Sequence, residues 1–163
     1  MIVVKLVSRS HQDYLIFVTD QLQKEYGTPD ARLLLQQFYG DLLFWITPID
    51  LSSTASLVRT SYSSKTKGRA PRDPGDMLRS ALLMTKSGMS VDDWVRALRT
   101  IPVYAILSGF EPRDTPGVGT FYDFFRRLWR AASPHKTGRT KRRLKKPRKK
   151  GKKNEKQKPK NPK

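Results

Sequence analysis

The chain of 163 residues is long enough for one domain of ordinary size and a further polar segment. Its 33 lysines and arginines against 14 acidic residues give a formal charge of +19, which favours polyanions as partners. It has no cysteine and only two histidines, which excludes disulfides and thiolate metal sites and argues against a zinc or histidine-based catalytic centre. We expect no cofactor.

Neither a secretion signal nor a membrane span is expected. Residues 1–7 are apolar but lack the long apolar core and the small-residue cleavage site of a signal peptide. The most apolar stretch, residues 33–46, contains Gln36, Gln37 and Asp41 and falls short of the ~18 uninterrupted apolar residues that indicate a membrane helix. We therefore expect a cytoplasmic protein without a membrane partner.

Two helices are predicted in a helical lead-in segment, residues 1–68. The first begins at Ser10 and ends at Gly27, and the second begins at Thr28 and ends before Pro48. Apolar residues recur at helical spacing in both: Tyr14, Phe17, Val18, Leu22 and Tyr26, then Leu34, Leu35, Phe38, Leu42 and Trp45.

The helical pattern continues in a second segment, residues 69–133. The end of the first segment is predicted to form a weak helix over 53–60, and a connection over 61–72 leads into the second. Helices over 73–87 and 91–99 and a helical turn or two over 102–107 follow. A loop over 108–119 then precedes a final helix over 120–132. Pro74 and Ser90 stand at helix starts, and Gly88 stands at a helix end. The predicted fold class is all-α, with a C-terminal half like a helix-turn-helix unit whose second connection is long.

The third segment, residues 134–163, is predicted to be a disordered basic tail. From residue 136 on it has 16 lysines and arginines, one acidic residue and, apart from prolines, the single apolar residue Leu144. Such a run is either a solvated tail that aids solubility or a polyanion-binding segment. In the second case we expect phosphate contacts from Arg139, Arg142, Arg143, Lys145, Lys146, Arg148, Lys149 and Lys150.

The helix over 120–130 is the element most suited to touch DNA. On a helical wheel four apolar side chains share one arc of about 100° that should pack on the core, with Trp129 at its margin: Phe121, Phe124, Phe125 and Leu128. The polar side carries the candidate DNA contacts Thr120, Tyr122, Arg126, Arg127 and Arg130. The alternative is an ordinary surface helix in which Arg127 pairs with Asp123.

Other patterns have simpler explanations. Glycines at 109, 117 and 119 indicate turns rather than a phosphate-binding loop, since no Gly-Lys-Ser/Thr follows them. Five acidic residues could suggest a two-metal carboxylate site: Asp73, Asp76, Asp92, Asp93 and Asp114. Positions at helix caps and in first turns explain four of the five more simply. All three tryptophans are expected in the core, with base stacking a lesser alternative for Trp129.

Residues 69–129 resemble the N-terminal domain of bacterial insertion-sequence transposases of the InsH-like group. The resemblance rests on R-A-P-R-D-P-G-D-M-L-R-S-A-L-L-M (69–84), S-V-D-D-W-V-R-A-L-R (90–99) and L-S-G-F-E-P-R-D-T-P-G-V-G-T-F-Y-D-F-F-R-R-L (107–128). The closing pattern of such domains, Thr-Phe-x-x-Phe-x-x-Arg-Leu, is matched by Thr120, Phe121, Phe124, Arg127 and Leu128.

The resemblance implies binding to the terminal repeats of the element, in the bacterial nucleoid, and leaves a homo-oligomer open as a further partner. In that family a separate RNase-H-like domain cuts DNA with three carboxylates and Mg²⁺, and no residue here matches that domain. We therefore expect no catalytic residue and no activity of this chain alone, with the basic tail as the linker to the missing domain. A general RNA- or nucleoid-binding protein that acts through its tail is the alternative, and a nuclease is the third.

Overall fold

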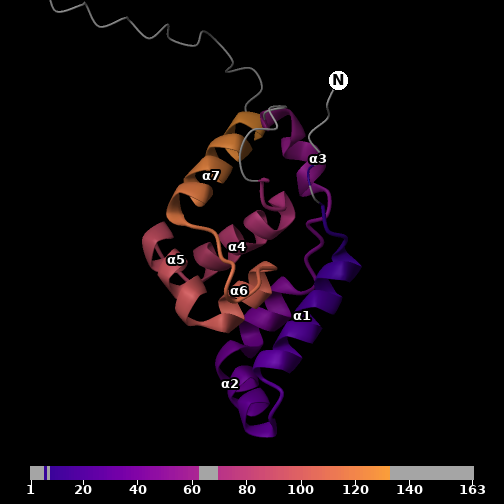
Figure 1. Ribbon diagram of the computed structural model, residues 1–163, viewed down its shortest axis with the longest axis vertical. Coiled ribbons are helices and arrows are strands. Elements are labelled where there is room, and N and C mark those ends of the chain that lie inside the picture. Colours follow the sequence, from indigo (N-terminus) through magenta and orange to yellow (C-terminus); the bar gives the residue numbers. More distant parts are fainter. Residues whose placement is uncertain (1–5, 7, 63–69, 133–163) are drawn as a thin grey trace, which may run out of the picture.

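The computed structural model describes residues 6, 8–62 and 70–132, which form helices and no strand, as the all-α prediction requires (Figure 1). The elements are α1 (His11–Glu25), α2 (Pro29–Ile46), α3 (Thr54–Val58), the 3-10 helix η1 (Arg59–Ser61), α4 (Pro74–Lys86), α5 (Val91–Thr100), α6 (Pro102–Ser108) and α7 (Val118–Ala132). None of these helices combines the length and the apolar character needed to cross a membrane. The predicted tail lies outside the described residues.

Polar caps fix the helix starts where the sequence indicates. The Ser10 Oγ accepts the backbone N–H of the residue three positions on at 3.1 Å in α1, and the Ser90 Oγ does the same at 3.2 Å in α5. The Asp73 carboxylate accepts the Gly75 N–H at 2.8 Å at the start of α4. Gly88 has a φ of 65° just beyond α4, a conformation in which glycine is free of strain.

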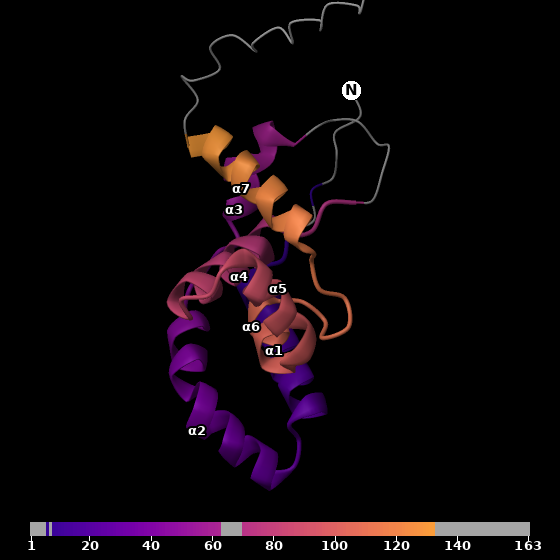
Figure 2. The same ribbon diagram turned by 90° about the vertical axis from the view of Figure 1, so that its left-hand side faces the viewer.

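Helix α6 lies at the centre of the fold, in contact with α1, α4 and α5 (Figures 1 and 2). Every residue from 103 to 110 is buried. The Tyr14 hydroxyl of α1 donates a hydrogen bond to the Leu107 carbonyl at 2.9 Å, and the Trp94 Nε1 of α5 donates to the Ser80 Oγ of α4 at 2.9 Å. One hydrophobic cluster joins side chains of α1 and α2 with those of α4 to α7, so both predicted helical segments share a core.

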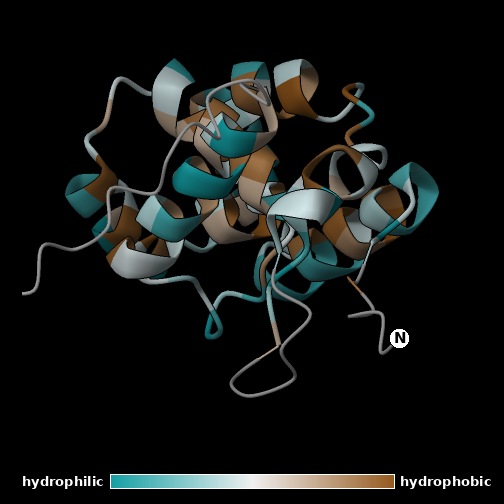
Figure 3. Ribbon diagram, turned by 90° about the horizontal axis from the view of Figure 1, so that it is seen from above, coloured by the Kyte–Doolittle hydropathy of each residue, from teal (hydrophilic) through white to brown (hydrophobic). Residues whose placement is uncertain are grey.

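Hydrophobic and hydrophilic residues alternate along the individual helices, as in amphipathic helices packed around a core (Figure 3). Helix α2 departs from the predicted arrangement. Its only buried residues are Leu35 and Ile46, whereas Leu34 and Phe38 of the predicted apolar stripe are exposed. The helix contacts α4, and its N-terminal part extends with α1 away from the other helices (Figure 2). Periodicity locates an apolar side but does not show whether another helix covers it.

Candidate nucleic-acid interface

Helix α7 is mounted on the core through aromatic side chains. Phe121 and Phe124 are buried, and Phe125 and Leu128 pack against the cluster at its edge. The helix contacts α3, α4, α5 and η1, and it begins two residues before the predicted start. The predicted apolar arc is therefore confirmed, and it fixes the direction in which the remaining side chains point.

The opposite side of α7 is open to solvent. Tyr122, Arg126 and Arg130 are exposed there and follow one another at intervals of four residues. Thr120 is also exposed, but it lies on the flank of the helix that carries Arg127. The Arg126 Nη1 lies 3.0 Å from the Asp123 Oδ1, in an exposed ion pair of the kind that contributes ~0.5 kcal/mol or less. Such a weak pair leaves the guanidinium available to a phosphate.

Arg127 does not lie on this open side, contrary to prediction. Its guanidinium carbon stands 4.5 Å from the centroid of the Tyr62 ring, which follows η1, and the side chain is half-buried. The pairing of Arg127 with Asp123, which belonged to the alternative of an ordinary surface helix, is not found, because Arg126 donates to that carboxylate. At about 100° per residue, Arg127 falls on the flank of the apolar arc that faces η1.

The placement of Trp129 corrects a second prediction. Its side chain is 69% exposed, whereas Trp94 is buried and Trp45 is half-buried beneath the Lys86 ammonium at 5.6 Å. Trp129 lies on the flank of the apolar arc opposite Arg127, and no described helix covers that flank. The side of the helix on which Trp129 lies could be predicted from its wheel position, about 20° from Tyr122.

Helices α3 and α7 lie at one end of the molecule and α2 extends to the other (Figure 1), and the two groups of helices differ in the sign of their charge. Residues 11–46, which form α1 and α2, contain five acidic and two basic residues. At the other end, α3, η1 and α7 contain four arginines and one acid: Arg59, Arg126, Arg127, Arg130 and Asp123. The described residues of α3, η1 and α7 thus have a net positive charge, and those of α1 and α2 have a net negative charge.

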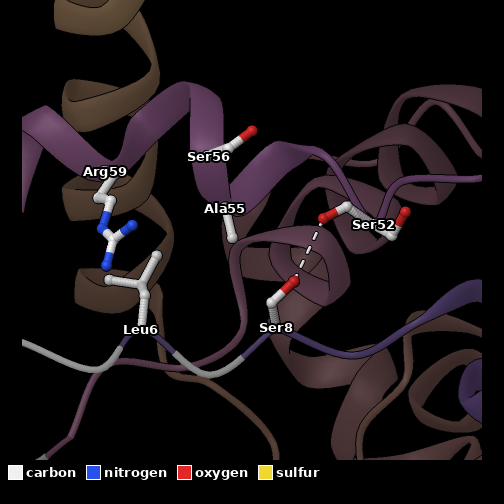
Figure 4. Close-up of a pocket in the computed structure, with 6 residues that line it drawn as sticks. All are labelled: Leu6, Ser8, Ser52, Ala55, Ser56 and Arg59. Carbon is white, nitrogen blue, oxygen red and sulfur yellow. Dashed lines mark hydrogen bonds between the residues drawn. The ribbon is translucent and has the colours of Figure 1, made fainter.

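A shallow pocket lies beside α3 at this basic end, lined by Leu6, Ser8, Ser52, Ala55, Ser56 and Arg59 (Figure 4). The Ser8 Oγ donates a hydrogen bond to the Ser52 carbonyl at 3.2 Å across it. Among the described residues that line it, Arg59 is the only charged one, and three serines supply the other polar side chains.

The acidic residues of the described ranges do not gather into a metal site, since no group of three or more potential ligands occurs there. Asp73 caps α4, and Asp92 and Asp93 lie in the first turn of α5. Asp114 forms an ion pair with Arg72 at 2.6 Å. Each therefore has a local structural partner or a capping position.

Asp76 belongs instead to a buried ionic cluster between α1, α4 and the end of α6. Its carboxylate lies 2.8 Å from the Arg79 guanidinium and 3.6 Å from that of Arg9. Arg79 in turn stands over the Tyr14 ring at 3.5 Å. Burial raises the pKa of the Asp76 carboxyl to about 7, although Arg9 and Arg79 act in the opposite direction. Gly109 closes the cluster with a φ of 93°.

The candidate phosphate contacts in the basic tail lie outside the described residues, so the structure bears only on those in α7. Comparison with protein-family models, with curated protein sequences and with solved structures finds no match to this chain.

Proposed function

We propose that the chain binds DNA as the N-terminal part of an insertion-sequence transposase, with α7 as the docking helix. The observation that carries the proposal is the exposed side of α7, where Tyr122, Arg126 and Arg130 follow one another on a helix held by Phe121 and Phe124. A rigid mount with outward guanidinium groups is what a helix needs to enter a major groove.

The surroundings of α7 support this proposal. The helix belongs to the basic end of the molecule, and the sequence continues from it into the region with 16 lysines and arginines. In this proposal α4, α5 and α7 act as the helix-turn-helix-like unit, with α6 in the long connection between α5 and α7. Because α6 is buried on all sides, it holds that unit against α1.

The transposase assignment rests on the resemblance of residues 69–129. In this proposal the chain recognises the ends of an insertion element, and a separate catalytic part supplies the carboxylates that cut and join DNA. The chain then has no catalytic activity of its own.

The docking helix is tested with the full chain by measuring its affinity for duplex DNA at several salt concentrations. If both arginines contact phosphates, the slope of log affinity against log salt should fall by about 1.8 in the double variant R126A/R130A. R32A is the matched control, since it removes an exposed arginine from the acidic end of the molecule. Equal binding by R126A/R130A and the parent chain would rule out α7 as the docking helix.

The recognition of element ends is tested by selection from a library of random duplexes. A transposase end-binding chain should enrich one defined sequence, and R126A/R130A should lose that enrichment. Equal affinity for all duplexes would instead favour the alternative function, a general nucleic-acid-binding protein that acts through its basic tail, whose charge alone supplies sequence-independent binding.

A further inference from the structure

Two aromatic side chains interleave with two arginines on the open side of α7. Tyr122, Arg126, Trp129 and Arg130 occupy positions i, i+4, i+7 and i+8, which fall on one side of a helix. We call these four residues the α7 stripe. Tyr122 is 52% and Trp129 is 69% exposed, so about half or more of each side chain is open to solvent.

The exposure of Trp129 has no structural explanation within the described residues. Tryptophan is among the side chains that bury the most area on average, and neither other tryptophan is exposed to this degree. An indole at the edge of a duplex groove gains little, because it has one N–H donor and the base faces are hidden in the stack. Unpaired nucleotides, in contrast, expose faces on which an indole can stack.

We propose that the α7 stripe binds single-stranded nucleic acid, with unpaired bases stacked on Trp129 and Tyr122 and phosphates on Arg126 and Arg130. Seven residues of helix separate the two rings by about 10 Å along the axis, which leaves room for separate nucleotides on each ring. Alternating cations and aromatic rings are the combination by which proteins hold single strands without reading their sequence. This inference rests on the proposed function and adds the class of nucleic acid that this helix accepts.

The test compares three oligomers on the full chain: a dT 12-mer, an abasic 12-mer with the same phosphates, and a 12-base-pair duplex. Only the dT 12-mer offers free base faces, so it alone should quench the fluorescence of Trp129. The spectrum of W129F is subtracted to remove the emission of the other two tryptophans. The W129A substitution should weaken binding of the dT 12-mer about tenfold, the effect of losing one stacked base. Its affinity for the abasic oligomer and the duplex should stay within about twofold. A parallel series with a U 12-mer shows whether RNA is accepted equally.

The matched control is F44A, which removes an aromatic side chain that is 85% exposed on α2, a helix outside the α7 stripe. It should leave all three affinities unchanged. Measurement at raised salt screens the contribution of the basic tail and leaves the stacking contribution visible.

Equal losses of W129A on all three oligomers, or no loss on the dT 12-mer, would overturn the inference. A change in Trp129 emission that follows protein concentration rather than added oligomer would also overturn it and would assign this surface to a protein contact. Failure here is distinct from failure of the proposed function. Duplex binding that depends on Arg126 and Arg130, together with an unchanged affinity of W129A for the dT 12-mer, rejects only the single-strand proposal.

Discussion

Helices α6 and α2 are both rich in apolar residues, yet they are placed in opposite ways. Helix α6 has seven residues, of which all but the first are buried between α1, α4 and α5. Helix α2 has eighteen residues, of which two are buried, and Leu33 and Phe44 are among its exposed side chains. The difference shows that apolar content alone does not determine burial, since burial also depends on which elements reach a helix.

The largest contrast should appear when the same substitution is made in both helices. L107A empties a buried site in α6 and should lower the free energy of unfolding by about 2–5 kcal/mol. L33A truncates a side chain that is 66% exposed in α2 and should change it by ~0.5 kcal/mol or less. Urea denaturation measures both. A large loss in L33A would mean that another surface covers α2 in solution.

Replacing glycine by alanine should change the stability of the fold in opposite directions in the two regions. A Cβ at Gly109, just beyond α6, would overlap the Asp76 carboxylate, and φ there is 93°. G109A should therefore destabilise the fold by about 1–3 kcal/mol or more. At Gly40, within α2, a Cβ would meet nothing closer than the Gln36 Cγ at 3.8 Å. G40A should stabilise by about 0.5–1 kcal/mol, because alanine favours the helix. Thermal unfolding of both variants checks the two signs.

The pH dependence of stability should report the cluster beside α6. The Asp76 carboxyl has a raised pKa, about 7 in the folded chain against 3.8 ordinarily, so the folded state binds more protons than the unfolded state between these values. The free energy of unfolding should therefore fall as pH rises from about 4 to about 7, by at most ~1.4 kcal/mol per pH unit from this group.

D76N should remove that decline, although it also leaves Arg79 without its carboxylate. The measurement is the slope of unfolding free energy against pH, and D41N on α2 is the control for loss of one exposed negative charge. An identical slope in D76N and the parent chain would show that the carboxyl is already ionised throughout this range.

Local signals in the sequence were sufficient to predict the helices. Ser10, Asp73 and Ser90 cap helices within three residues of themselves, so their effect does not depend on the rest of the fold. The arc of Phe121 and Phe124 was predictable for a related reason, because two successive turns repeat the same apolar spacing.

Contacts between distant segments could not be predicted in this way. Arg127 packs over the ring of Tyr62, which lies 65 positions earlier in the chain, and therefore does not lie on the open side of α7. The periodicity of a single helix cannot predict such a contact. The exposure of Phe38 likewise depends on the absence of a covering element among the described residues. The side on which Trp129 lies was within reach of the sequence, since it falls beside Tyr122 on a helical wheel, but its exposure was not.

The approach of Gly109 to Asp76 also constrains how this sequence can diverge. Two positions 33 residues apart share one small volume, so a side chain at the later position fits only if the earlier one becomes smaller. Chains descended from the same ancestor should therefore keep glycine beyond this helix wherever they keep the acid. The φ of 93° favours glycine there even after the acid is lost, so replacement of the acid should precede replacement of the glycine.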